Sequence, residues 1–269
     1  MANPVLDTGF ASPTSVYETS TTQQHRVGSR AILGDRSFRY VKFISGTALA
    51  PNVVAQSGPP ADNHTTQQET GPFTAGATTM SLTLGATVAH DQQYQEGYVR
   101  IETATLGVGQ IYRIRSHPYS AVSVALTVDL YDPIVTTTSG TEVWSLLQNP
   151  WSNPLILVAS GSTQTGIAVG VPLVNFAACA TASVATSGYL QTATSTWTQP
   201  KYGWFQTWGV CSVLQDASAV LVGTNAIGGT VAGSVGVDVE TVIKNPIGFP
   251  MKSLTSSGAY GGIFLRIAP

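Results

Sequence analysis

MSLTLGATV, residues 80–88, alternates apolar residues with small or hydroxyl-bearing ones. A period of two is typical of a half-buried β-strand, because successive side chains of a strand point to opposite faces of the sheet. The apolar face predicted for this strand consists of Met80, Leu82, Leu84, Ala86 and Val88. The stretch therefore predicts a sheet with one face in a core and the other face in polar surroundings.

The same alternation recurs along the chain and predicts further strands. Residues 121–130 place Val122, Val124, Leu126, Val128 and Leu130 on one face. Residues 234–243 place Val235, Val237, Val239 and Ile243 on one face and Asp238 and Glu240 on the other. Residues 262–267 alternate Ile263, Leu265 and Ile267 with Phe264 and Arg266. Weaker strands are predicted at residues 37–43, 98–103, 111–116 and 155–159.

Turn signals rich in glycine and proline separate these runs, as in SGPP at residues 57–60 and KNPIGFP at residues 244–250. Short strands punctuated by such turns are typical of β-sandwiches and barrels. Helical periodicity is missing except in TEVWSLLQN, residues 141–149, which predicts one short helix. We therefore expect an all-β protein of sandwich or barrel modules, with an extended N-terminal arm and very little helix.

The chain divides into an arm and two β-rich modules. Residues 1–34 are rich in Thr and Gln and lack periodicity, as expected of an arm that a neighbouring subunit holds in place. A boundary near residues 149–154 separates a β-rich domain at 35–150 from a barrel-like or sandwich domain at 151–269. The strand at 37–44 could also pair with this last module, which would make that domain discontinuous.

The chain contains few charged residues, which limits the kinds of molecule that it could bind. Charged residues make up 10% of the chain, against about 25% in an average globular protein. The net charge is −2, so copies of the chain repel one another weakly, which suits a protein packed among many neighbours. The 12 Lys and Arg residues are scattered, which argues against nucleic acid as a partner.

Targeting signals and cysteines give further limits. No apolar run approaches the roughly 20 residues of a membrane-spanning helix, so we expect no membrane association. The first residues lack the basic and apolar regions of a signal peptide, so we expect synthesis in a cytoplasm. Cys179 and Cys211 do not make a disulfide framework; they could pair, but two separate buried thiols are favoured.

Residues suited to catalysis or metal binding are sparse. His25, His64, His90 and His117 lie far apart in the sequence. No G-x-S-x-G, H-x-x-x-H, C-x-x-C or P-loop pattern occurs. We therefore predict no catalytic residues, no metal ligands and no cofactor. A hydrolase that uses His90 and Asp91 is the remaining enzymatic hypothesis.

Arginine is the residue type most suggestive of partner contact. Arg113 and Arg115 alternate with Tyr112 and Ile114, so a strand would present both guanidinium groups on one face. Arginine binds carboxylates in a bidentate manner and is enriched at interfaces, although a solvated sheet face would show the same pattern. The predicted partner-contact residues are Tyr17, His25, Arg26, Arg30, Arg36, Arg39, Arg113 and Arg115.

The segment KYGWFQTWGV, residues 201–210, contains four large rings. On a strand, Tyr202, Trp204 and Trp208 share one face, whereas Phe205 lies on the other. A sugar-binding platform needs carboxylates or amides beside its rings, and only Gln206 is near. These four aromatic residues are therefore predicted to form a core or an intersubunit seam, in preference to a sugar platform.

Several segments, taken in order, resemble tailed-bacteriophage virion proteins of the head-decoration or capsid-auxiliary type. The segments are residues 25–54, 75–117, 124–134, 149–151, 202–214 and 223–239. They cover more than half of the chain, and the resemblance depends on their order because no single motif is diagnostic.

The resemblance implies a β-rich, non-enzymatic protein bound in many copies to a capsid, in some members as trimers. Its partners would be the major capsid protein and copies of itself on the virion surface, with residues 2–30 lying across a neighbouring subunit. A tail component or a shell subunit would fit the same strands, but the long helix expected of a shell protein is missing. The alternative function is a carbohydrate- or host-binding β module, such as a tail or fibre component.

Overall fold

The structure is a computed structural model that describes residues 5–6, 15–69, 71–103, 106–163, 165–179, 200–216, 222–237, 246–252 and 258–269. This part of the chain contains no helix and forms two curled antiparallel sheets, which confirms the predicted all-β fold class. Among the described residues there is consequently no helix that is long and apolar enough to span a membrane.

The larger sheet has eleven strands and joins both ends of the chain. Eight of them run in the order β1-β2-β3-β13-β17-β16-β14-β15, while β4, β11 and β12 attach beside β13. Their bounds are β1 Val5–Leu6, β2 Arg30–Leu33, β3 Arg36–Phe43, β4 Ala55–Gln56, β11 Leu155–Ile156, β12 Ala168–Pro172, β13 Lys201–Leu214, β14 Ala226–Gly228, β15 Val235–Val237, β16 Gly248–Pro250 and β17 Tyr260–Arg266.

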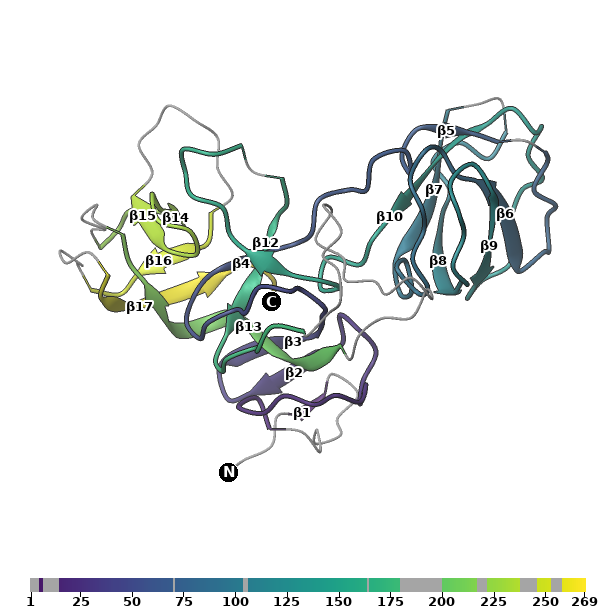
Figure 1. Cartoon of the computed structure of the whole chain (residues 1–269). Helices are drawn as coiled ribbons and strands as arrows, with labels where there is room; N and C mark the ends of the chain where they lie inside the picture. Colours follow the sequence, from purple (N-terminus) through teal and green to yellow (C-terminus); the bar gives the residue numbers. More distant parts are fainter. Residues whose placement is uncertain are drawn as a thin grey trace.

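The smaller sheet has six strands in the order β5-β10-β7-β8-β9-β6 and forms a separate lobe, at the right of Figure 1. Its bounds are β5 Gln67–Gln68, β6 Thr79–Thr83, β7 Tyr98–Thr103, β8 Ile111–Ser116, β9 Ala125–Leu130 and β10 Val143–Leu147. Every strand of this lobe comes from one continuous stretch, residues 67–147, so the lobe is an insertion between strands of the larger sheet.

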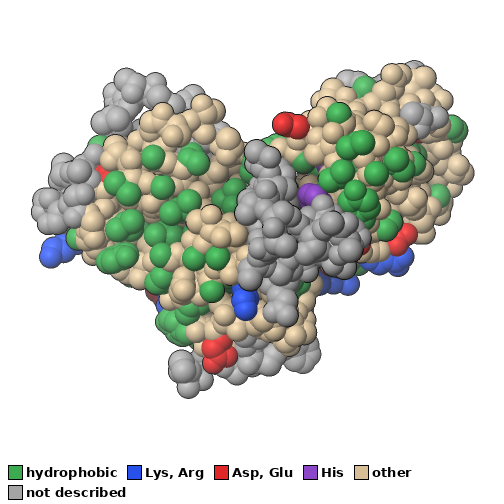
Figure 2. Space-filling view, in the orientation of Figure 1, with side chains coloured by type: hydrophobic (Ala, Val, Ile, Leu, Met, Phe, Trp, Pro, Cys, Tyr) green, Lys and Arg blue, Asp and Glu red, His purple; other side chains and the backbone are tan. Residues whose placement is uncertain are grey.

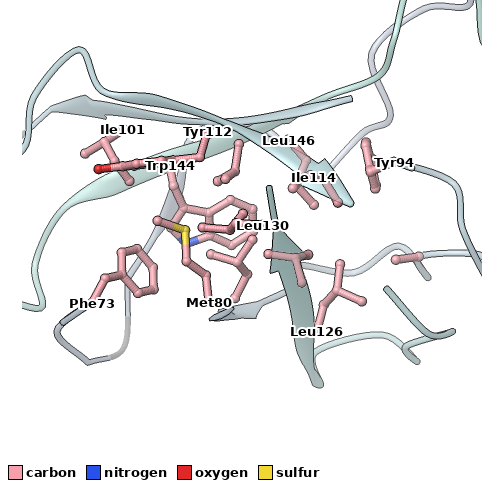
Figure 3. Packing of buried hydrophobic residues seen from close by; sticks show 14 of the residues in the cluster. Phe73, Met80, Tyr94, Ile101, Tyr112, Ile114, Leu126, Leu130, Trp144 and Leu146 are labelled. Carbon is pink, nitrogen blue, oxygen red and sulfur yellow. The ribbon is translucent and has the colours of Figure 1, made fainter. Parts of the chain in front are cut away.

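The six-stranded sheet curls around a hydrophobic core of its own (Figure 3). Met80 from β6, Ile114 from β8, Leu126 from β9 and Trp144 from β10 are fully or almost fully buried in it. The alternation in residues 80–84 therefore has its predicted effect, because Met80, Leu82 and Leu84 are buried and Ser81 is exposed.

The alternation fails where a turn interrupts the strand. Val122 and Val124 are exposed instead of facing the core, because Ser123 adopts a positive φ of 55° and β9 begins only at Ala125. Likewise, β6 ends at Thr83, so Ala86 and Val88 do not extend its buried face. The predicted faces at Asp238, Val239, Glu240 and Ile243 lie outside the described residues.

The short helix predicted at residues 141–149 is wrong, because Val143–Leu147 form strand β10. This strand lies between β5 and β7, and its main chain pairs with both. Trp144 and Leu146 point into the core two residues apart, which is a strand spacing. Local helix propensity is thus overridden by burial of the indole and by sheet pairing.

The strand pairing divides the chain differently from the expected domains at 35–150 and 151–269. Strand β3, which covers the 37–44 stretch, pairs with β13, and β4 pairs with β11 and β12. Strands β3 and β4 therefore belong to the larger sheet together with β11 to β17. The insertion leaves that sheet after β4 and returns to it at β11.

The expected arm, residues 1–34, is in part an integral piece of the larger sheet. Val16 and Val27 are buried, and Arg30–Leu33 form strand β2 beside β3. Ser20 exchanges two main-chain hydrogen bonds with Tyr202, with N–O distances of 2.7 and 2.8 Å. Residues 15–30 therefore pack on the body of their own chain, whereas residues 1–4 and 7–14 lie outside the described residues; contact of the arm with a neighbouring subunit stays a prediction.

Burial of the arm gives a direct test of this packing. A Val16→Asp variant places an unpaired carboxylate in a hydrophobic cluster, away from the arginine pocket, and is expected to lower the free energy of unfolding by about 4 kcal/mol or more. Thr21→Asp, at an exposed position of the same segment, is the control and is expected to change it by less than about 0.5 kcal/mol. Chemical denaturation measures both; equal effects would contradict the packing.

Candidate functional site

Four of the predicted contact arginines line one pocket between the two sheets. Arg26 comes from the arm, Arg30 from β2, Arg39 from β3 and Arg113 from β8, and the pocket has a volume of about 410 Å³. The sequence named these residues but gave no indication that residues 26–39 and 113 would meet. The other lining residues are Val27, Gly28, Ser29, Tyr98, Asn149 and Trp151, so no acidic residue lines the pocket.

Asn149 holds the three segments around the pocket together. Its Nδ2 donates to the main-chain oxygens of Val27 at 3.3 Å and Glu96 at 3.0 Å, and its Oδ1 accepts from the N–H of Trp151 at 3.0 Å. The residue is buried, so these bonds are shielded from water. The pocket wall is therefore tied to the arm, to the smaller sheet and to the returning linker through one side chain.

Aromatic rings hold three of the guanidinium groups in place. The Cζ of Arg39 lies 5.2 Å from the ring centre of Trp151, whose Nε1 donates to the main-chain oxygen of Val169. The Cζ atoms of Arg26 and Arg113 lie 4.8 and 5.5 Å from the ring centre of Tyr131. Such cation–π contacts restrict the motion of the guanidinium planes without neutralising their charge.

Glu96 is an acidic residue that forms an ion pair with one of the pocket arginines. Its Oε2 lies 2.6 Å from Nη2 of Arg113, and its Oε1 accepts a hydrogen bond from the Tyr131 hydroxyl at 2.6 Å. Burial and the Glu96 charge raise the pKa of Tyr131, so this phenol stays a donor at neutral pH. Within the described residues, Glu96 thus forms one ion pair, with Arg113.

Arg30 and Arg39 oppose each other directly in the β2–β3 ladder. Arg39 donates to the main-chain oxygens of Gly28 at 3.2 Å and Pro269 at 3.1 Å. The Nε of Arg30 is buried and has no hydrogen-bond partner among the described residues. The pair therefore places two like charges side by side at the pocket wall.

The other four predicted contact residues lie outside the pocket. Tyr17 is exposed, and its hydroxyl accepts a hydrogen bond from Nη1 of Arg36 at 3.4 Å. Arg115 is exposed and lies 4.0 Å from Asp129. His25 packs against the rings of Tyr40 and Trp204, and this burial lowers its pKa.

The aromatic strand segment lies mainly in the core. Tyr202 and Trp204 are buried with Tyr40 and the arm on one face of β13, and Phe205 is buried on the other. Trp208 is half-buried and packs edge-on against Phe264 at 5.6 Å. With Trp204 fully buried, these rings do not form an exposed sugar platform.

The burial of Trp204 predicts a structural phenotype. Trp204→Ala is expected to lower the free energy of unfolding by about 3–5 kcal/mol, because a fully buried indole leaves a large cavity. Val210→Ala, on the exposed part of the same strand, serves as the control, with an expected change below about 0.5 kcal/mol. Guanidinium unfolding measures both, and an unchanged midpoint in Trp204→Ala would refute the core assignment.

The histidines of the smaller lobe are engaged in its own hydrogen bonds. Nε2 of His117 accepts from the N–H of Tyr94 at 2.8 Å, and its Nδ1–H donates to the Pro118 oxygen. Burial lowers the pKa of His117 to about 4. His64 bonds to the Tyr94 hydroxyl and to the Thr87 oxygen.

His90 and Asp91, the pair of the hydrolase hypothesis, have different surroundings. His90 is buried, and its main-chain N–H donates to the side chain of Gln93. Asp91 interacts electrostatically with Lys42. Burial lowers the pKa of Lys42 to about 8, and the negative charge of Asp91 partly opposes this shift. Among the described residues, no group of three or more His, Cys, Asp or Glu side chains could hold a metal ion.

Glu69 and Glu142 form a buried carboxyl pair that the sequence did not indicate. Glu69 directly follows β5 and Glu142 directly precedes β10. The two residues are far apart in the sequence, but these strands pair with each other. Burial raises the pKa of Glu69 to about 7, and the nearby Glu142 adds to the shift. Burial alone would raise the pKa of Glu142 as well, but hydrogen bonds from Ser139 and two further main-chain N–H groups outweigh it and lower this pKa.

The raised pKa of Glu69 predicts a pH effect on stability. Between pH 4.5 and about 7 the unfolded chain ionises this group while the folded protein keeps it protonated, so its contribution to stability falls as the pH rises. Glu69→Gln removes this titration. The unfolding free energy of the variant relative to wild type is expected to rise by about 1–3 kcal/mol from pH 4.5 to pH 8.

Urea denaturation at a series of pH values measures this difference. The matched control is Glu18→Gln, which removes a carboxyl group at an exposed position away from the buried pair. A constant difference for Glu69→Gln would contradict the assignment.

Cys179 and Cys211 are both buried free thiols in separate hydrophobic clusters, so they do not form a disulfide. Burial raises the pKa of both, to about 12 for Cys211. These thiols therefore stay protonated and act as small apolar side chains.

Comparison with known proteins adds no relative: no family model, no curated protein and no solved structure matches this chain.

Proposed function

We propose that the chain is a non-enzymatic structural protein of a bacteriophage particle, which binds the capsid and copies of itself through many weak contacts. The sequence segments at residues 25–54 and 75–117 support this assignment, because their order along the chain resembles that in head-decoration proteins. The all-β fold agrees with it. In this role the chain stabilises the shell by holding neighbouring subunits together, because weak contacts add up on a closed lattice.

The observation that carries the proposal is a group of exposed apolar side chains at one end of the smaller lobe. Leu106, Val108 and Ile111 lie at the β7–β8 connection and are 46–54% exposed. Val135 is 75% exposed and belongs to the segment after β9 that approaches this connection, since a Cβ on Gly107 would lie 3.4 Å from Cγ2 of Thr138. We call these four residues the hairpin patch. Covering each large aliphatic side chain contributes about 1.5–3 kcal/mol at most, which suits a contact repeated many times.

The chain as a whole is close to neutral. Figure 2 shows exposed hydrophobic side chains spread over both lobes and few charged ones on the face that it draws. The whole chain carries 12 basic and 14 acidic residues. Weak mutual repulsion lets copies approach closely, and clustered apolar groups then favour protein contact over solvent.

The proposal predicts where the chain resides and which side chains attach it. Electron cryo-microscopy of native virions is expected to find many copies on the capsid surface. A Val108→Asp/Val135→Asp variant is expected to lower occupancy on particles at least about tenfold, because two carboxylates replace buried methyl groups at the contact. The variant should fold, since both positions are exposed.

Val231→Asp/Met251→Asp, two exposed apolar positions of the larger sheet, is the matched control. It adds the same charge away from the hairpin patch and should bind particles like wild type. Quantitative analysis of purified particles measures occupancy. A chain missing from virions would refute the proposed function, and equal occupancy of both variants would refute the role of the patch.

A further inference from the structure

The arginine pocket brings like charges together at its wall. Arg30 and Arg39 stand opposite each other in neighbouring strands, and like charges in this position destabilise a sheet. Among the described residues, Arg26 and Arg30 form no ion pair, and Glu96 forms its ion pair with Arg113. An anion between the guanidinium groups would convert this repulsion into attraction.

The donors in the pocket are arranged before any ligand arrives. Arg26 and Arg113 are held over Tyr131, and Arg39 is held over Trp151. The buried Nε of Arg30 has lost its water and has no acceptor in the described structure, which leaves one donor of the pocket wall unsatisfied. Binding to such fixed donors loses little conformational entropy.

Main-chain N–H groups at the pocket wall are engaged within the protein, which favours a carboxylate over a phosphate as the ligand. Phosphate sites in proteins commonly use several free main-chain N–H groups at a loop or a helix N-terminus. Here the N–H of Gly28 donates to the Tyr40 oxygen and that of Ser29 donates to the Arg26 oxygen. The charged donors of the pocket are planar guanidinium forks, which bind a carboxylate with two parallel hydrogen bonds.

We propose that the arginine pocket is a carboxylate-binding site, which takes a ligand with two or more carboxylate groups. Its volume of about 410 Å³ admits several acidic groups at once, either from an acidic segment of a partner protein or from a free polycarboxylate. This site goes beyond the proposed function and does not depend on it, because binding is measured on the purified chain without particles.

Isothermal titration calorimetry tests the site with three probes at equal ionic strength: hexaglutamate peptide, citrate and inorganic phosphate. Arg30→Gln is expected to weaken polycarboxylate binding on the order of tenfold or more, because one charge-assisted donor is lost. Its melting temperature at low salt is expected to rise, since the opposition to Arg39 is removed. Arg115→Gln removes the same charge from the exposed face of β8 and should bind like wild type.

The outcomes separate the sources of the ligand. Binding of hexaglutamate alone assigns the site to an acidic protein segment, and binding of citrate alone assigns it to a free organic acid. Phosphate binding as tight as that of both carboxylate probes overturns the proposal, as does failure of all three to bind wild type. Should Arg30→Gln fail to fold, Arg26→Gln at an exposed position replaces it. Unchanged affinity in a folded variant also overturns the proposal.

Discussion

The burial of strand β13 on both faces is the constraint on which the larger sheet depends. Its main chain pairs with β3, β12 and β17, so it has neighbours along most of its length. Tyr202 and Trp204 pack under the arm on one face, while Phe205 packs on Phe43 and Phe176 on the other. Such a strand needs a covering layer on each face, and the N-terminal arm of the chain supplies the layer over Tyr202 and Trp204.

Close packing around β13 explains two of its glycines. A Cβ on Gly203 would lie 2.6 Å from the ring of Phe176, so a side chain there would push the two layers apart. Gly209 adopts a φ of 86° just after the register shift between Gln206 and Trp208. A non-glycine residue would be strained at Gly209. The rings of KYGWFQTWGV therefore fit the interior of the protein only because small residues separate them.

Alternation predicted the strands well where a single strand runs straight through a core. Ile263 and Leu265 are buried as expected, and Tyr112 and Ile114 point inward while Arg115 is exposed. Alternation could not reveal the turn at Ser123, whose positive φ ends the pattern. The helix predicted at residues 141–149 was wrong for a different reason, since sheet pairing on both sides outweighs local preference.

The candidate site was predictable in residue type but not in arrangement. Arginine side chains were chosen for their chemistry, and four of them do share a pocket. Their meeting depends on how the inserted lobe lies against the arm, which pairwise spacing in the sequence does not encode. Glu69 and Glu142 were missed for the same reason, because only the β5–β10 pairing brings their backbones together.

The inserted lobe also bears on how fast the chain reaches its final form. Its strands all pair within residues 67–147, whereas β3 must find β13 across a gap of more than 150 residues. Closing so long a loop is entropically costly, and folding slows when such distant contacts dominate. The lobe should consequently assemble early and shorten the effective separation, which leaves the β3–β13 pairing as the slow, rate-limiting step during synthesis.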